Sequence, residues 1–415
     1  MLSTSDPEVW NFYKKEWRRQ EEGLELIPSE NYASTDVMAA AGGIFTNKYA
    51  EGYPKKRYYG GNEWIDEVEI LAIERVKSLF KEQFANVQPH AGSQANMAAY
   101  FALLQPGDTV MGLNLSQGGH LTHGSPVNFS GKMYKVVPFN LHPETHLLDY
   151  DEIARLAEAH KPKMIIAGFT AYPRQVDFQK FAKIAHSVNA KLMADMSHVA
   201  GLIAGGAHPS PIGHADVTTS TTHKTLRGPR GAFILSPNED TAKSIDKAVF
   251  PGLQGGPLEN MIMAKAVALR EAAQPEFKQY AVQIVKNSKA LAAALTDLGF
   301  VLVSGGTDTH LILIDLRNRK LTGKEAQIAL DASGITGNKN TIPNDPQSPF
   351  ITSGLRIGTP ALTTRGMKEK EMAMVAHWMD EVLKSPSDEN VRKKVKDEIR
   401  RMTADFPIYP GLIKE

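Results

Sequence analysis

Residues 164–195 read MIIAGFTAYPRQVDFQKFAKIAHSVNAKLMAD and contain two short apolar runs on either side of an amphipathic segment. The runs Met164–Phe169 and Lys191–Asp195 have the length of strands, and their apolar character is typical of strands that are buried on both faces. Between them, Phe178–Val188 has the spacing of apolar residues that a helix requires. The order of strand, helix and strand predicts an α/β layer with parallel neighbouring strands.

The same alternation continues on both sides of this stretch. We expect further strands at Thr109–Leu113, Tyr134–Pro138, Asp216–Thr221 and Ala232–Leu235, and a further helix at Asp151–His160. The predicted fold class is therefore α/β, with a mostly parallel sheet that is flanked by helices and lies in a large domain.

The pattern becomes less regular towards the C-terminus. Leu258–Leu298 predicts one long helical region, and it precedes a strand at 301–304, the strand HLILIDL at 310–316, a helix at Gly323–Ala332, the strand GLRIGT at 354–359 and two terminal helices. Such a mixture indicates a smaller α+β domain. We predict an N-terminal arm at residues 1–34, a large domain at residues 35–270 and a small C-terminal domain at residues 271–415.

The composition excludes several classes of site. The chain has 415 residues and no cysteine, which rules out disulfides, cysteine nucleophiles and thiolate metal ligands. Its formal net charge of +1 creates no general attraction for nucleic acid or for an anionic membrane. The first residues lack the apolar core of a signal peptide, and no apolar stretch is long enough to span a bilayer. We therefore expect a cytoplasmic location and neither a nucleic-acid nor a membrane partner.

A lysine and an aspartate are expected at the same edge of the sheet. Lys224 lies between a Thr-rich strand and a Gly/Pro turn, and Asp195 ends the strand KLMAD. Ligands of open α/β sheets bind at the carboxyl ends of the strands, where an amine could condense with an aldehyde and a carboxylate could pair with a protonated pyridine nitrogen. The alternatives are a solvated loop lysine and a helix-capping aspartate. Together the two residues favour a Schiff base between Lys224 and pyridoxal phosphate.

A phosphate site is expected where residues 87–104, VQPHAGSQANMAAYFALL, pass from a strand through a glycine turn into a helix. Ser93 is expected to open this helix, where free backbone N–H groups and a hydroxyl could hold a phosphate. The alternative is an ordinary serine N-cap.

His120 and His123 form an H-x-x-H pair, but a third metal ligand is not visible, so we expect no metal. An imidazole flanked by glycines instead suits stacking on an aromatic ring.

Several long motifs resemble the serine hydroxymethyltransferase family, and the resemblance runs almost from end to end. The motifs are LIPSENY at 26–32, EGYPKKRYYGG at 51–61, GGHLTHGSPVNFSG at 118–131, THKTLRGPRG at 222–231 and SGLRIGTPALTTRG at 353–366. The resemblance implies the aspartate-aminotransferase-like fold, type I among pyridoxal-phosphate enzymes. It also implies transfer of the hydroxymethyl carbon of L-serine to tetrahydrofolate, which gives glycine and 5,10-methylenetetrahydrofolate.

The resemblance further implies roles for individual residues. At the cofactor it implies Lys224 as the Schiff-base lysine, Asp195 at the pyridine nitrogen, His120 stacked on the ring, Gly92, Ser93 and His223 at the phosphate, Thr170 and His198 near the phenolic oxygen, and Tyr49 and Gly256 from a neighbouring subunit. At the substrates it implies Ser29, Tyr59 and Arg356 around the amino-acid carboxylate, Glu51 between amino acid and folate, and Leu115, Gly119, His120, Leu121, Asn340, Ser348, Pro349 and Phe350 at the folate. Lys224, Glu51, Tyr59 and His198 are the expected catalytic residues. Because two residues would serve a neighbouring site, we expect a homodimer or homotetramer.

Four positions depart from the family pattern, namely Gln117, Ser197, Asn260 and Gly337. They leave two alternative functions open, a hydroxymethyltransferase for 2-methylserine and a folate-independent aldolase for 3-hydroxy amino acids. A catalytically inactive binding protein is disfavoured because Lys224, Asp195 and Arg356 are all present. A Rossmann oxidoreductase is disfavoured because GxGxxG does not follow an early strand.

Overall fold

The computed structural model describes residues 2–412, and the chain divides into two compact units. The larger unit is Ala33–Val282, and the smaller unit joins the residues up to Tyr32 to those from Gln283 onwards. The division falls within the helix α12 (Pro275–Asp297). None of the helices in the described part of the chain is both long and apolar enough to cross a membrane.

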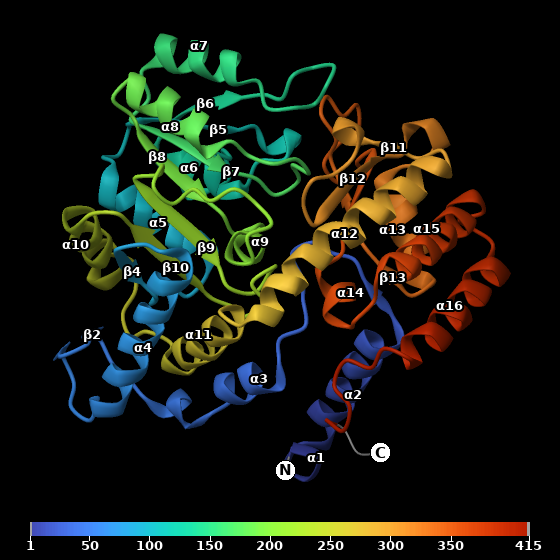
Figure 1. Ribbon diagram of the computed structural model, residues 1–415, viewed down its shortest axis with the longest axis horizontal. Coiled ribbons are helices and arrows are strands. Elements are labelled where there is room, and N and C mark those ends of the chain that lie inside the picture. Colours follow the sequence, from blue (N-terminus) through green and yellow to red (C-terminus); the bar gives the residue numbers. More distant parts are fainter. Residues whose placement is uncertain (1, 413–415) are drawn as a thin grey trace. The chain divides into compact units, whose positions relative to one another are not determined.

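The larger unit is built on a seven-stranded sheet (Figure 1). From one edge to the other the strands are β4 (Phe84–Asn86), β10 (Ala232–Ser236), β9 (Val217–Thr221), β8 (Lys191–Asp195), β7 (Met164–Gly168), β5 (Thr109–Leu113) and β6 (Lys135–Phe139). The pairs from β9 to β6 are all parallel, and β10 is antiparallel to both of its neighbours. The predicted α/β class with a mostly parallel sheet is confirmed.

Helices cover both faces of this sheet, as the burial of alternate residues in β7 demonstrates. Ile165 packs in a cluster with Phe181 of α8 (Phe178–Ser187) and with residues of α7 (Tyr150–His160). Met164 and Ile166 belong instead to a cluster with α5 (Gly92–Leu103) and α10 (Glu239–Lys247). Because both faces of β7 are buried, its sequence is continuously apolar, which is why the strand could be recognised.

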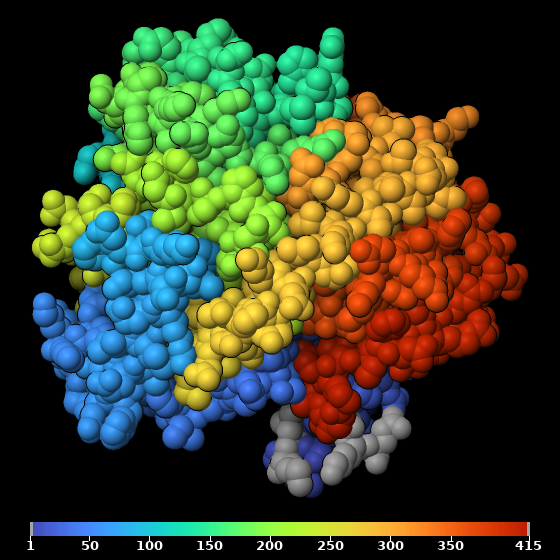
Figure 2. Space-filling model, viewed as in Figure 1, coloured from blue at the N-terminus to red at the C-terminus, as the bar shows by residue number. Residues whose placement is uncertain are grey.

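The rest of the larger unit consists of further helices and one small hairpin. It comprises α3 (Thr35–Ala41), the hairpin of β2 (Gly52–Tyr53) and β3 (Lys56–Arg57), α4 (Glu63–Phe80), α6 (Phe129–Met133), α9 (Ala200–Ala204) and α11 (Glu259–Ala272). Helix α11 packs against both α3 and α4, and Figure 2 shows its gold surface beside their blue surface. This packing leaves one side of α11 facing the strands of the sheet's antiparallel edge, through Ile262 and Leu269.

The smaller unit contains a four-stranded antiparallel sheet with helices against it. The strands, in spatial order, are β11 (Val301–Leu302), β12 (Leu311–Asp315), β15 (Gly354–Gly358) and β14 (Asn338–Asn340). The helices after α12 are α13 (Gly323–Ala332), α14 (Pro360–Thr364), α15 (Glu369–Lys384) and α16 (Glu389–Ala404). Ile312, Ile357 and Val375 lie in one core that joins this sheet to α15.

The N-terminal residues are an integral part of the smaller unit. They form α1 (Leu2–Ser5), α2 (Pro7–Glu22) and β1 (Leu24–Glu25), and β1 pairs in parallel with β13 (Ile335–Thr336). The buried Arg365 donates hydrogen bonds to the backbone carbonyls of Gln20, Glu21 and Gly23, at 2.8–3.2 Å. These bonds attach the end of α2 to α14 and to the strand pair beside it.

Two local predictions are wrong. Leu258–Leu298 is not continuous helix, because α11 ends at Ala272 and α12 begins at Pro275. Proline has no N–H to donate and disfavours a helical conformation in the residue before it, so it can begin a helix but not continue one. The strand expected at residues 301–304 stops at Leu302, and Ser304 adopts a left-handed conformation with φ of 59°.

Candidate active site

Asp195 and Lys224 come from neighbouring parallel strands at the same edge of the sheet. Asp195 ends β8 and is in register with Thr219 of β9, and Lys224 follows the end of β9 by three residues. Lys224 is buried, with 9% of its surface exposed, and its positive charge is one of those that lower the pKa of Asp195. The amine and the carboxylate therefore lie within electrostatic reach of each other, as their places in the sequence predict.

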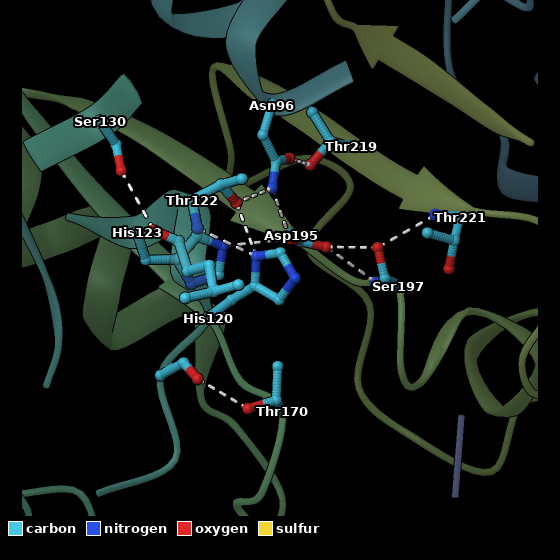
Figure 3. Close-up of polar contacts among 12 residues, drawn as sticks. Asn96, His120, Thr122, His123, Ser130, Thr170, Asp195, Ser197, Thr219 and Thr221 are labelled. Carbon is cyan, nitrogen blue, oxygen red and sulfur yellow. Dashed lines mark hydrogen bonds and ion pairs between the residues drawn. The ribbon is translucent and has the colours of Figure 1, made fainter. Parts of the chain in front are cut away.

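The Asp195 carboxylate accepts four hydrogen bonds from the protein (Figure 3). Its Oδ1 accepts from the backbone N of Ser197 at 3.1 Å and from the Ser197 hydroxyl at 2.5 Å. Its Oδ2 accepts from Nδ2 of Asn96 at 2.8 Å and lies 3.0 Å from Nε2 of His123. Burial by itself would raise the pKa of Asp195, but the bond from His123 and nearby positive charges outweigh burial and hold the pKa far below its ordinary value. Asp195 is thus a buried, ionised carboxylate.

A second layer of hydrogen bonds holds these donors in place. Asn96 of α5 also donates to the Thr122 hydroxyl at 2.8 Å and accepts from the Thr219 hydroxyl of β9 at 2.6 Å. The Ser197 hydroxyl accepts from the backbone N of Thr221 at 3.0 Å. Sequence reasoning did not find Asn96, nor the bonds that Ser197 and His123 make. A polar residue in the Ala-rich helix of residues 92–103 is the one signal that could have pointed to Asn96.

The loop after β5 carries His120 next to this network. Its Nδ1 lies 2.7 Å from the Thr122 hydroxyl and accepts from the Thr122 backbone N at 3.2 Å. Leu115 and Leu121, on either side of His120 in the loop, are 42% and 46% exposed. Thr170, which follows β7, donates to the backbone carbonyl of Gly119 at 2.6 Å. This bond fixes the loop that presents His120 and the two exposed leucines.

The first turn of α5 and the start of the Lys224 loop have groups suited to an anion. Helix α5 begins at Gly92 after Ala91, and no side chain caps its first N–H groups. Ser93, the second helical residue, is exposed. A Cβ atom at position 92 would lie only 2.6 Å from Cγ2 of Thr221, so glycine is required for this close approach. The helix end therefore retains unsatisfied donors and a positive dipole.

His223 contributes a donor to the same region. Arg230 lies 2.9 Å from its Nε2, and burial together with the charges of Arg230 and Lys224 lowers the pKa of His223 to about 3. The imidazole is therefore neutral, with Nε2 accepting from Arg230 and the proton on Nδ1. That Nδ1 and the Thr221 hydroxyl are buried and have no hydrogen-bond partner within residues 2–412. The oxygens of a phosphate group could accept a hydrogen bond from Nδ1 of His223 and from the Thr221 hydroxyl. These residues therefore fit the predicted cofactor.

Tyr49, Glu51, Tyr59 and Gly256 form a second group in the larger unit. The Tyr49 hydroxyl donates to Oε1 of Glu51 at 3.0 Å, which raises the pKa of Tyr49. The rings of Tyr49 and Tyr59 meet edge to face, with centroids 5.3 Å apart. A Cβ on Gly256 would lie 3.2 Å from the Tyr49 ring. Both tyrosines are more than half exposed, so this group is open to a ligand or to another copy of the chain.

His198 lies behind the Lys224 loop. It is buried, and its backbone carbonyl accepts a hydrogen bond from the Thr225 hydroxyl at 2.9 Å. Because Thr225 follows Lys224 directly, this bond ties the loop to the segment after β8.

As for metals, no group of three or more His, Asp or Glu side chains that could hold an ion occurs among residues 2–412.

The smaller unit brings together Arg356, Asn340 and the segment before Ser29. Arg356 of β15 donates through Nε to Oδ1 of Asn338 at 3.1 Å, and burial lowers its pKa to about 10, which leaves it charged at neutral pH. Asn340 lies on β14, in register with Gly354 of the same β15. The backbone N of Gly358 donates to the carbonyl of Leu26, which places residues 26–29 along β15. The turn Ser348–Phe350 is exposed, with Phe350 84% accessible.

Comparison with protein families identifies the family of the chain. The family model described as serine hydroxymethyltransferase matches residues 2–379, which is most of the chain and includes both groups of the larger unit as well as β14 and β15 of the smaller one. Enzymes of this family use pyridoxal phosphate as cofactor and tetrahydrofolate as co-substrate. The chain therefore belongs to the serine hydroxymethyltransferase family and is a pyridoxal-phosphate-dependent transferase.

Proposed function

We propose that this chain transfers the hydroxymethyl carbon of L-serine to tetrahydrofolate, giving glycine and 5,10-methylenetetrahydrofolate. The observation that carries the proposal is the pair at the carboxyl ends of β8 and β9, where the ionised and buried Asp195 lies within electrostatic reach of the buried Lys224. A cationic heterocycle bound against this ionised carboxylate would pair with its negative charge.

The residues that would hold pyridoxal phosphate divide by the part of the molecule they contact. Lys224 would bond to its aldehyde carbon, Asp195 would pair with its ring nitrogen, and His120 would stack on the ring. Thr170 and His198 would lie near the phenolic oxygen. The phosphate would take the N–H groups of Gly92 and Ser93 and the Nδ1 proton of His223. When bound, the cofactor supplies an electron sink for the bond that breaks in the substrate, and a protonated ring nitrogen strengthens it.

Arg356 and Ser29 would bind the carboxylate of the amino acid. A guanidinium forms two parallel hydrogen bonds with a carboxylate, which fixes orientation as well as position. That orientation decides which bond of the substrate's α-carbon is aligned with the ring, and alignment of this kind can lower a barrier substantially. The bond from Arg356 Nε to Asn338 supports this role, because it fixes the orientation of the guanidinium.

Glu51, Tyr49 and Tyr59 would donate and accept protons during the reaction. The folate would lie over the exposed leucines. The Tyr49 hydroxyl donates a hydrogen bond to the Glu51 carboxyl in the folded chain, so the two groups are within reach of each other for proton transfer. Leu115 and Leu121 offer apolar surface for the flat part of folate, and Gly119 would contribute the backbone of the loop between them. Asn340 and the turn Ser348–Phe350 would add polar and aromatic contacts to the folate.

The proposal is tested with the purified chain, pyridoxal phosphate and four candidate substrates. L-Serine, D-serine, 2-methylserine and L-threonine are incubated with and without tetrahydrofolate, and glycine or D-alanine is measured. We expect formation of glycine from L-serine that depends on tetrahydrofolate. Preference for 2-methylserine would favour the first alternative, and cleavage of threonine that ignores folate as the main activity would favour the aldolase.

A reduction experiment tests the role of Lys224 separately. Borohydride should fix pyridoxal phosphate to the peptide that contains Lys224, as mass spectrometry would detect, and Lys224→Ala should lose both the adduct and steady turnover. Lys243→Ala is the control, because Lys243 is an exposed residue of α10 that pairs with Glu239. An adduct that persists in Lys224→Ala would contradict the assignment.

A further inference from the structure

Lys265 is a buried lysine that the proposed chemistry does not use. It lies on α11 and has 2% of its surface exposed. Its Nζ donates to the backbone carbonyls of Val87 at 2.6 Å, Ala232 at 2.8 Å and Pro89 at 3.1 Å. An ammonium group has three N–H donors and a neutral amine has two, so the set of three acceptors matches the charged form.

The three carbonyls belong to the two segments that carry the proposed cofactor site. Val87 and Pro89 lie between the end of β4 and Gly92, the first residue of α5. Ala232 opens β10 immediately after the loop that carries Lys224, and its backbone N donates to the Pro89 carbonyl at 3.3 Å. Lys265 therefore contacts the segment before α5 and the end of the Lys224 loop with one group.

The Lys224 loop is closed at the same point. The backbone N of Thr222 donates to the Gly231 carbonyl at 3.0 Å, and the Thr222 hydroxyl donates to the Pro229 carbonyl at 2.5 Å. A Cβ atom on Gly231 would lie 2.5 Å from Cε of Lys265 and 3.2 Å from its Nζ. Position 231 thus has room for the lysine only because it is glycine, and the two residues are matched in shape.

Two buried acids lie close enough to the lysine to influence its pKa. Burial lowers the pKa of Lys265 to about 7, and the charges of Glu69 of α4 and Glu259 of α11, which are both about 1% exposed, oppose this lowering. Arg57 of β3 binds Glu69 at 2.6 Å and lies 3.8 Å from Glu259. An apolar side chain could fill the space of Lys265, but it would remove a donor from three buried carbonyls, of which Pro89 would keep the bond from the backbone N of Ala232. Such a site is unusual for a residue that only fills a core.

We infer that Lys265 is a positioning residue for the cofactor, because its ammonium holds the segment Val87–Gly92 against the end of the Lys224 loop. The inference rests on the proposed cofactor site. Through these contacts the phosphate-binding turn and the reactive amine keep a fixed separation before any ligand arrives, so binding requires less ordering of the chain.

The test uses Lys265→Met, which has a side chain of similar length without a donor. We expect its dissociation constant for pyridoxal 5′-phosphate, followed by absorbance, to rise on the order of tenfold to a hundredfold, in line with the cost of leaving buried acceptors unpaired. In the cofactor-free protein, hydrogen exchange should become faster in residues 87–93 and 222–232. Arg75→Met is the matched control, since Arg75 donates to the carbonyl of Ala266, next to Lys265, at 2.6 Å and lies on α4, outside both segments.

Gly231→Ala is a second variant, in which Lys265 is still present but its side chain is displaced. Its added methyl group should move Lys265 away from the carbonyls and weaken cofactor binding in the same direction, so the test stands even if Lys265→Met does not fold. Unchanged affinity and unchanged exchange in either folded variant would overturn the inference. If the wild-type chain itself fails to bind pyridoxal 5′-phosphate, the proposed function fails, whereas the exchange measurement still decides whether Lys265 orders the two segments.

Discussion

Arg356 shows how a single residue type can set the chemistry of a site. Its guanidinium is buried, charged and held on one side by Asn338 in the adjacent strand. A lysine at this position would keep the charge but would lose the planar fork that matches a carboxylate. A change at Arg356 should therefore alter the affinity for the amino acid, because Arg356 is not proposed to exchange protons with it.

Replacing Arg356 with lysine is expected to raise KM for serine by about tenfold to a hundredfold, because one charge-assisted hydrogen bond is lost and one is weakened. Steady-state kinetics over a range of serine concentrations would measure the change. Affinity for pyridoxal phosphate should stay the same in the variant. A KM equal to that of the wild type would remove Arg356 from the substrate pocket.

His223 should make the stability of the cofactor-free chain depend on pH. Its pKa is lowered to about 3 in the fold from an ordinary value of 6.5, so between these values the unfolded chain binds a proton that the folded chain does not. Stability therefore falls as the pH is lowered from 6.5 towards 3. His223→Gln should flatten this dependence by up to about 1.4 kcal/mol per pH unit. Urea unfolding at several pH values between 4.5 and 6.5 would measure it, and parallel curves for the two proteins would refute the prediction.

At the scale of elements, the ends of helices and strands carry the proposed function. Helix α5 has no side-chain cap, and the strands β8 and β9 end at Asp195 and just before the Lys224 loop. These termini were predictable because strand length and apolar pattern are local properties of the sequence. The break between α11 and α12 was missed because the apolar spacing continues across Pro275, although the proline itself was a sufficient signal.

The attachment of α2 to the smaller unit depends on Arg365. Besides the carbonyls of Gln20, Glu21 and Gly23, its guanidinium donates to those of Phe406 and Thr403. Arg365→Met is expected to lower the free energy of unfolding by about 2–4 kcal/mol, since several buried acceptors lose a charged donor. Chemical denaturation would measure the loss, and limited proteolysis should cut the N-terminal segment faster. Wild-type stability in the variant would show that water replaces the guanidinium without cost.

At the scale of the whole molecule, the exposed group of Tyr49, Glu51, Tyr59 and Gly256 bears on assembly. We propose that Tyr49 and Gly256 complete the site of a neighbouring copy, so that the working unit is a homodimer or a homotetramer. The large exposed fractions of Tyr49 and Tyr59 support the proposal, because aromatic residues in such positions are typical of interfaces.

Mixing two inactive variants would test the shared site. Tyr49→Ala and Lys224→Ala should each be inactive alone, and after subunit exchange their mixture should regain up to about a quarter of the wild-type activity, because half of the random dimers would contain one intact site. A mixture of His120→Ala with Lys224→Ala is the control, since both residues belong to one subunit and no site is restored. Absence of recovery in the first mixture, despite proven exchange, would place Tyr49 in its own subunit's site.

The sequence alone determined the α/β class, the six strands from Thr109 to Ser236 to within one residue at either end, and the placing of Asp195 and Lys224 at one edge. Each of these follows from a local pattern of apolar residues or from the end of a strand. Only the tertiary structure decided which side chains meet that edge. Asn96 bonds to Asp195, which is 99 residues away in the sequence. Lys265 bonds to Val87 and Pro89, which are 178 and 176 residues away, and to Ala232, which is 33 residues away. Such contacts depend on how helices pack on a sheet. A buried polar atom bonds to whichever partner that packing brings within hydrogen-bond distance, and a local sequence pattern does not identify that partner.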